Sequence, residues 1–177
     1  FTFKNLYKNI EEADIFSIVS VNKQVAVEIT FCRNGQNFGS NTHFVDNKIE
    51  ENLGHILQKF IEQFYTTQNI PKTIIISQDI YEKELLENAF LSKTKSKVNI
   101  ILAKKGNTKL IVKEAIKSAE INLAKKISEM NKTKNLLDKL KSKFSFVNNV
   151  NNIEVYDNSH FSGKEAVGSY IVANREG

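Results

Sequence analysis

The chain has 177 residues, of which 41% are hydrophobic, and its formal net charge at pH 7 is +5. That length and apolar content suffice for the core of one domain, or of one domain and part of another. No stretch of eighteen apolar residues occurs and the first residues lack the basic-then-apolar order of a signal peptide, so we expect no membrane span and a cytoplasmic location. The single cysteine, Cys32, has no disulfide partner and no closely spaced histidine for zinc, so we interpret it as a buried structural thiol.

The positive charge is concentrated in one part of the chain. Fifteen lysines and four acidic residues lie between residues 93 and 143, whereas the rest of the chain is net negative. Such a block can neutralise phosphates and release counterions, which is typical of nucleic-acid binding. A lysine-rich surface with almost no arginine is also what an AT-rich genome imposes on proteins, so an ordinary solvated face is the alternative interpretation.

Turn signals and hydrophobic periodicity divide the first hundred residues into strands and helices. Asn34-Gly35, between two alternating runs, is a strong hairpin signal, and Pro71 prevents the preceding helix from continuing. The predicted order is strands at residues 15–21, 25–31 and 38–45, a helix at 49–64, a strand at 73–77, a helix at 81–91 and a strand at 98–102.

The next segment predicts a long amphipathic helix. Apolar residues recur at spacings of three and four from Val112 to Met130. The apolar stripe breaks at Lys134 and resumes at Leu137, which predicts a kink or a second helix. The polar, Asn-rich residues 146–152 then predict a linker.

The order of these elements indicates a fold class. Three antiparallel strands followed by helix, strand, helix, strand and helix is the order of a ribonuclease-H-like α/β fold, a mixed sheet in which a meander is extended by right-handed crossovers. We therefore predict a ribonuclease-H-like upstream domain at residues 1–145, followed by the linker and by the first hairpin of a second such domain at 153–177. Element order does not by itself give activity.

The motif richest in chemistry lies near residue 157, where a carboxylate, a hydroxyl and an imidazole follow a short apolar strand. These side chains belong to Asp157, Ser159 and His160. Phosphodiester hydrolysis by two metal ions needs converging carboxylates, because the ions clamp both the attacking and the leaving oxygen. Oxygen ligands favour hard cations, so the pattern is typical of a magnesium- or manganese-dependent nuclease.

This motif resembles the start of the endonuclease region of the UvrC family of excinucleases. The family signature is matched at Ile153, Glu154, Tyr156, Asp157, Ser159, His160 and Gly163, followed by Val167 and Ser169. Similarity to the region upstream of the signature is carried by residues 60–65, 70–72, 75–77, 84–86 and 105–112. The resemblance therefore covers nearly the whole chain.

The chain departs from the family pattern in two ways. Ser118-Ala119 stands where the long helix usually carries an Asn-Ala pair, and the chain ends before the Asp-Gly-Gly segment that helps to complete the family's metal site. We therefore expect an internal fragment, in which residues 153–177 are the truncated start of the endonuclease domain.

The resemblance implies a function in nucleotide-excision repair. The family makes the metal-dependent cut in double-stranded DNA beside a lesion, with Mg²⁺ or Mn²⁺ as cofactor and with the damage-loading helicase subunit UvrB as partner. The implied activity belongs to the full-length protein, and we expect the isolated fragment to be inactive. Two alternatives stay open: a non-catalytic DNA-binding or scaffolding module, and a protein-interaction domain that docks through its long helix.

The resemblance also assigns roles around the signature. Asp157 is predicted to be catalytic and to bind the metal, although an Asx turn over residues 157–159 is the structural alternative. His160 is predicted to be catalytic by orienting a phosphate or water, and Ser159 to contact the nucleic-acid backbone. Glu154 lies three residues before Asp157, so on a regular strand the two carboxylates point to opposite faces.

We expect the upstream domain to be catalytically inactive. Asp14 near the first strand has no carboxylate partner beyond Glu28, and Lys104-Lys105 stand where a further acid would be needed. These two lysines and Lys109 are instead predicted to bind nucleic acid, because they cluster where a strand ends and a helix begins. His43 and His55 have no metal-ligand spacing, so we interpret both as solvent or core residues.

Overall fold

The computed structural model describes residues 6–46, 52–161 and 164–174. It divides into two compact units, residues 1–123 and 124–177, which are described separately below. The elements in chain order are β1 Glu12–Val21, β2 Gln24–Arg33, β3 Gln36–Asp46, α1 Leu53–Thr67, β4 Thr73–Ile76, α2 Lys83–Thr94, β5 Asn99–Leu102, α3 Gly106–Lys143, β6 Asn152–Phe161 and β7 Lys164–Asn174. None of the described helices combines the length and apolarity needed to cross a membrane.

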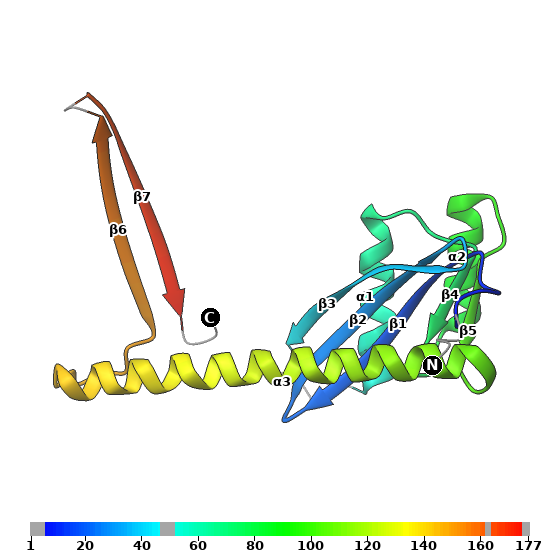
Figure 1. Ribbon diagram of the computed structural model, residues 1–177, viewed down its shortest axis with the longest axis horizontal. Helices are drawn as coiled ribbons and strands as arrows, with labels where there is room; N and C mark the ends of the chain where they lie inside the picture. The colour runs from blue at the N-terminus through cyan, green and yellow to red at the C-terminus, as the bar shows by residue number, and fades with distance from the viewer. Residues whose placement is uncertain (1–5, 47–51, 162–163, 175–177) are drawn as a thin grey trace, which may run out of the picture. The chain divides into compact units, whose positions relative to one another are not determined.

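The first unit is built on a mixed five-stranded sheet with strand order β3-β2-β1-β4-β5 (Figure 1). The strands β1, β2 and β3 form an antiparallel meander, and β4 and β5 extend it in parallel with β1. The meander closes through the turn at Gly35, whose φ of +71° is a conformation that glycine adopts without strain. The predicted ribonuclease-H-like fold class is confirmed, and the second unit contains the predicted hairpin, formed by β6 and β7.

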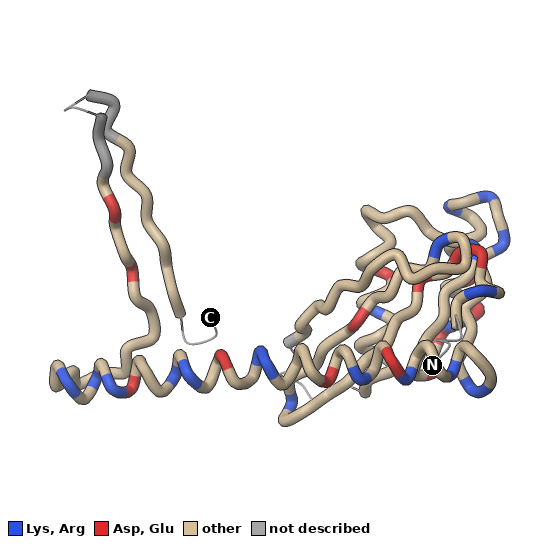
Figure 2. The backbone as a smooth tube through the Cα atoms, viewed as in Figure 1, with Lys and Arg blue, Asp and Glu red and all other residues tan. Residues whose placement is uncertain are grey.

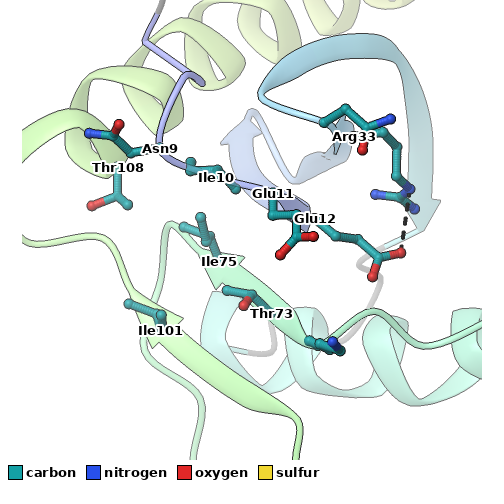
Figure 3. A pocket seen from close by; sticks show the side chains of 11 residues that line it. Asn9, Ile10, Glu11, Glu12, Arg33, Thr73, Ile75, Ile101 and Thr108 are labelled. Carbon is teal, nitrogen blue, oxygen red and sulfur yellow. Dashed lines mark ion pairs between the residues drawn. The ribbon is translucent and has the colours of Figure 1, made fainter.

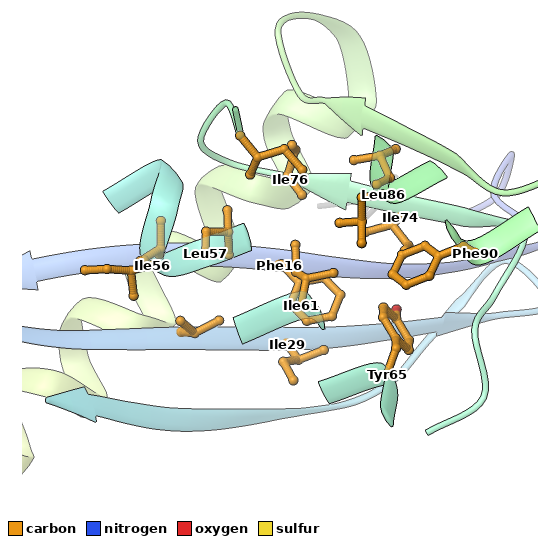
Figure 4. Close-up of a cluster of buried hydrophobic side chains, with 14 of the residues drawn as sticks. Phe16, Ile29, Ile56, Leu57, Ile61, Tyr65, Ile74, Ile76, Leu86 and Phe90 are labelled. Carbon is orange, nitrogen blue, oxygen red and sulfur yellow. The ribbon is translucent and has the colours of Figure 1, made fainter. Parts of the chain in front are cut away.

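Helices cover both faces of the sheet because its strands are apolar on both sides. On one face, α1 and α2 bury a large core around Phe16, Ile61, Tyr65 and Phe90 (Figure 4). The first turns of α3 cover the other face, where Ile111 and its neighbours pack on a smaller cluster that includes the fully buried Cys32. Burial raises the pKa of the Cys32 thiol, in keeping with the predicted structural role.

A buried ion pair links three elements of the first unit. The Asp14 carboxylate on β1 is 1% exposed. Its Oδ1 lies 2.8 Å from Nη1 of Arg33 on β2, and its Oδ2 accepts a hydrogen bond of 2.8 Å from the Tyr65 hydroxyl on α1. Oδ2 therefore has a hydrogen-bond donor, and Oδ1 has an ionic partner but accepts no hydrogen bond. An opposite charge and a donor are what make a buried carboxylate tolerable.

A second buried carboxylate holds α3 on the opposite face. Glu28 is 1% exposed, and its Oε1 accepts a hydrogen bond of 2.9 Å from the Ser118 hydroxyl on α3. Its Oε2 accepts one from Thr42 on β3, and the Thr42 hydroxyl in turn accepts a bond of 2.7 Å from the Asn122 amide, one helical turn after Ser118. These contacts fix the rotation of the helix about its own axis.

The prediction of a kink or a second helix near Lys134 was wrong. The helix α3 runs without a break through 38 residues. No proline or glycine follows Gly106 inside it, and residues such as Lys, Leu and Glu favour helices, so the interruption of the apolar stripe at Lys134 removes packing but not backbone hydrogen bonding.

Replacing Tyr65 by Phe should destabilise the first unit by about 1–3 kcal/mol, because one oxygen of a buried carboxylate loses its hydrogen-bond donor. Urea unfolding followed by circular dichroism measures the loss. A control is Tyr81→Phe, since the Tyr81 ring is 70% exposed and should tolerate the change. Equal stability of the Tyr65→Phe variant and the wild type would contradict the role assigned to the hydrogen bond between Tyr65 and Asp14.

The same variant should also change the response to alkaline pH. Burial, and then the Asp14 carboxylate, raise the pKa of Tyr65 in the folded state above its unfolded value of about 10. The folded protein therefore keeps a proton that the unfolded chain loses, and the stability from Tyr65 is complete below about pH 10 and falls as pH rises further. The free energy of unfolding, measured by urea denaturation at a series of pH values above about 10, should fall less steeply with pH for Tyr65→Phe than for the wild type.

Candidate active site

The candidate site lies on the β6–β7 hairpin. The two strands pair without a register shift from Asn152 opposite Asn174 to Ser159 opposite Val167. In an antiparallel ladder, paired residues share a face, and the face alternates along each strand. One face therefore carries Asp157, Ser169 and the aliphatic residues Val155 and Ile171, and the other carries Glu154 and Tyr156.

Asp157 lies in the middle of β6 rather than at the end of a strand. We predicted a shorter strand that stopped before this residue, and that prediction was wrong, because the ladder continues to Phe161. The backbone at Asp157 is extended and pairs with Ser169, which also rules out the alternative of an Asx turn over residues 157–159. Its exposed side chain has no hydrogen-bond or ion-pair partner among the described residues.

The second carboxylate of the signature points away from the first, as predicted. Glu154 accepts a hydrogen bond from the Tyr156 hydroxyl, and this bond raises the pKa of Tyr156. The Tyr156 ring stacks on the ring of Tyr170 across the ladder, with centroids 5.8 Å apart. Glu154 and Asp157 therefore cannot share a metal ion on this hairpin.

The remaining signature residues are described only in part. Ser159 and His160 continue the backbone of β6, and the ladder has an irregularity between Ser159 and Phe161. Their side chains, and the whole of Gly163, lie outside what the structure describes. The predicted roles of Ser159 and His160 therefore stay predictions.

Asp157 is not joined by other metal-binding side chains in the described part of the chain. Within residues 6–46, 52–161 and 164–174, no group of three or more His, Cys, Asp or Glu side chains could hold a metal ion. An exposed carboxylate has the oxygen chemistry that Mg²⁺ or Mn²⁺ prefers, but one carboxylate is too few for a protein-bound pair of ions.

The carboxylates of the first unit do not form a second metal site. Asp14 and Glu28 lie on opposite faces of the sheet, and each is engaged by its own set of donors. Where β4 ends, the Ser77 hydroxyl accepts a hydrogen bond of 3.0 Å from the Ile18 amide on the neighbouring strand. The chain thus has a hydroxyl that ties two strands together at the strand ends where parallel sheets commonly bind ligands.

The predicted basic cluster is exposed at the end of β5. Lys104 and Lys105 fill the connection between β5 and α3, and Lys109 lies in the first turn of the helix; all three side chains are exposed or partly exposed. The two histidines are engaged elsewhere in the first unit. The His43 ring packs 5.3 Å from Phe60 and the His55 ring 6.3 Å from Tyr81, measured between centroids.

A cleft of about 490 Å³ opens on the α3 side of the sheet, between the start of β1 and the strands β4 and β5 (Figure 3). Ile75 and Ile101 form an apolar wall, and Glu12 and Arg33 form an ion pair of 3.7 Å across its rim. Arg33 also forms an ion pair with Asp14, so its guanidinium is already paired within the protein and is a poor candidate for binding a ligand in the cleft. The cleft lies at the strand ends opposite to Ser77 and Lys104.

Sequence reasoning missed the partners of both buried carboxylates. Arg33 and Tyr65 lie 19 and 51 positions from Asp14 along the chain, so no local pattern connects them. A signal did exist on α3, because Ser118 and Asn122 are polar residues four positions apart on the otherwise apolar face that contains Ala115 and Ala119. Polar residues at such positions need a buried partner.

Comparison with known proteins supports the resemblance to the UvrC family that the motif around Asp157 indicated. The model of the UvrC ribonuclease-H-like domain matches residues 12–126, and that of the UvrC RNase H endonuclease domain matches residues 141–177. Among curated relatives, UvrABC system protein C of Bradyrhizobium diazoefficiens is 36% identical over 96% of this chain and 25% of its own length. The proteins of the same name from Brucella abortus and Bartonella henselae are 33% and 35% identical over 96% of this chain, and 28% and 26% of their own lengths are covered. The chain thus spans about a quarter of the length of these relatives, and by both family matches and by these relatives it belongs to the UvrC family.

Proposed function

We propose that this chain forms part of the DNA-incising subunit of nucleotide-excision repair and that Asp157 binds a catalytic Mg²⁺ or Mn²⁺ ion there. The observation that carries the proposal is the exposed Asp157 carboxylate, which has no partner among the described residues although it is held in a regular ladder opposite Ser169. A carboxylate kept free in this way is suited to a hard cation. The membership of the chain in the UvrC family supports the same assignment.

When bound, the metal ion would polarise a phosphate oxygen and lower the pKa of an attacking water. Asp157 would contribute one anionic oxygen ligand, and His160 and Ser159 would orient the phosphate backbone near it. The other metal ligands are not among the described residues, so cutting is proposed for the longer protein. Its substrate would be damaged double-stranded DNA, its partner the damage-loading subunit UvrB, and its setting the cytoplasm and the SOS response.

The first unit has a different role in this proposal: it is a non-catalytic brace. Its two buried carboxylates are consumed by structural contacts, with Asp14 bound to Arg33 and Tyr65 and Glu28 bound to Thr42 and Ser118. A second candidate function, binding of DNA without chemistry, is favoured by the lysines Lys104, Lys105 and Lys109 at the β5–α3 connection. The two functions are compatible within one protein.

The 177-residue chain alone should not cut DNA in Mg²⁺ or Mn²⁺, because its described residues gather no group of carboxylates that could hold the ions required for in-line hydrolysis. Incubation with undamaged and lesion-containing duplexes, followed by denaturing gel electrophoresis, checks this. Damage-specific incision that stops on addition of EDTA would show that the chain already completes the site.

In the longer protein, Asp157→Asn should reduce the metal-dependent cut beside the lesion by about a hundredfold or more, since losing a metal ligand removes several kcal/mol of transition-state stabilisation. The matched control is Glu154→Gln on the same strand, which neutralises a carboxylate on the opposite face and should leave the cut intact. Because Asp157 is exposed, its substitution should change the free energy of unfolding by less than about 0.5 kcal/mol. Equal loss in both variants, or retention of the cut in Asp157→Asn, would remove Asp157 from the metal site.

A further inference from the structure

A row of lysines follows the outer surface of α3. Lys105 stands immediately before the helix, and Lys109, Lys113 and Lys117 follow at intervals of four residues, all with exposed side chains. Residues four apart are neighbours on one face of a helix. Figure 2 shows positive residues recurring along this element. Together with Lys104, the row extends for about 18 Å at the usual rise of about 1.5 Å per residue.

The packing of α3 keeps this row turned away from the sheet. The side of the helix opposite to Lys113 is buried through Ile111 and Ala115. The hydrogen bonds from Ser118 to Glu28 and from Asn122 to Thr42 add directional contacts on that same side. Rotation of α3 about its axis would bury lysines and expose Ile111, which is unfavourable. The packing of α3 on the sheet therefore keeps the lysine side chains exposed to solvent.

Ion pairs with the rest of the described chain do not neutralise the row. Within the described residues, no carboxylate forms an ion pair with any of these lysines. Like charges four positions apart destabilise a helix by about 0.2–0.5 kcal/mol per pair, so the arrangement carries a small cost. Lys117 differs from the rest, because Glu114 and Glu120 lie three positions before and after it on the helix.

We propose that Lys104, Lys105, Lys109 and Lys113, termed here the corner lysines, bind the phosphate backbone of duplex DNA. These lysines span about 12 Å along the helix at about 1.5 Å per residue, a length over which a duplex presents about seven phosphates, given about one charge per 1.7 Å of its axis. Lys117 contributes less, because its two acidic neighbours offset its charge. The inference rests on the proposed function only for the choice of DNA as the polyanion.

The chemistry of the row predicts binding without sequence preference. A lysine ammonium is a compact point charge that does not read base edges with the paired geometry of an arginine or an amide. The exposed apolar residues Leu110 and Ile121 of the same helix are aliphatic, at 49% and 60% exposure, and offer no ring for base stacking. The corner lysines would therefore hold the duplex and leave recognition of the lesion to other parts of the protein.

The test compares two quadruple variants of the 177-residue chain with equal changes in net charge. One replaces the corner lysines by Gln, and the control replaces Lys132, Lys134, Lys139 and Lys143 on the second half of α3. Binding of a fluorescent mixed-sequence duplex is titrated in EDTA at several salt concentrations between about 50 and 200 mM. The corner variant should show a salt slope smaller by about three to four, at about 0.9 per lost duplex contact, and the control should lie near the wild type.

Single substitutions sharpen the test. Lys113→Gln should reduce the slope by about one, and Lys117→Gln by less than half of that, although both side chains are exposed on the same helix face. Equal slopes for the two quadruple variants, or a slope equal to that of the wild type in the corner variant, would overturn the proposal. Because these titrations contain no metal and measure no cutting, failure of Asp157 as a metal ligand would leave their outcome unchanged.

Discussion

The ion pair between Asp14 and Arg33, completed by the Tyr65 hydroxyl, is the contact on which the first unit most depends. A carboxylate that is 1% exposed needs compensation for its lost hydration, and here an ion pair from β2 and a hydrogen bond from α1 supply it. The pair therefore ties the central strand β1 to its neighbour and to the helix that covers its face. Breaking it by removing one partner leaves a buried charge without compensation, which is far more costly than losing an exposed salt bridge.

The same constraint explains why the first unit has acids on a ribonuclease-H-like sheet and yet no metal site among its described residues. Its second buried carboxylate, Glu28, lies on the other face and orients α3 through Ser118. A metal pair needs carboxylates that converge and that are free to accept the ion, whereas Asp14 and Glu28 diverge and are held by an ion pair and by hydrogen bonds. The acids have become structural, and the helix that Glu28 holds carries the lysine row on its outer side. The buried Glu28 side chain therefore helps to determine which face of α3, and hence which lysines, are exposed.

The sequence was sufficient for the elements and their order, because period-two runs, an Asn-Gly turn and apolar stripes with spacings of three and four are local signals. It was insufficient wherever a long-range contact decided the outcome. Arg33 and Tyr65 meet Asp14 only after the sheet and α1 have packed, and the length of β6 depends on its ladder with β7 rather than on its own composition. The continuity of α3 at Lys134 was missed for a related reason, since an apolar stripe reports packing, whereas a helix continues wherever its backbone can. The prediction that Asp157 binds a metal ion came from the motif, and it stays a prediction.

The two sheets differ in how firmly they can hold a functional side chain. The five-stranded sheet is covered on both faces, so residues such as Ser77 are fixed by their surroundings. The hairpin holds Asp157 by one ladder, and its aliphatic neighbours Val155 and Ile171 are 56% and 69% exposed. A two-stranded hairpin is at best marginally stable in water, and a metal ligand must be kept within about 0.5 Å of its working position by packing around it. The metal binding proposed for Asp157 would therefore need further packing against this exposed hairpin, and this is a physical reason to propose incision for the longer protein and duplex binding for the chain itself.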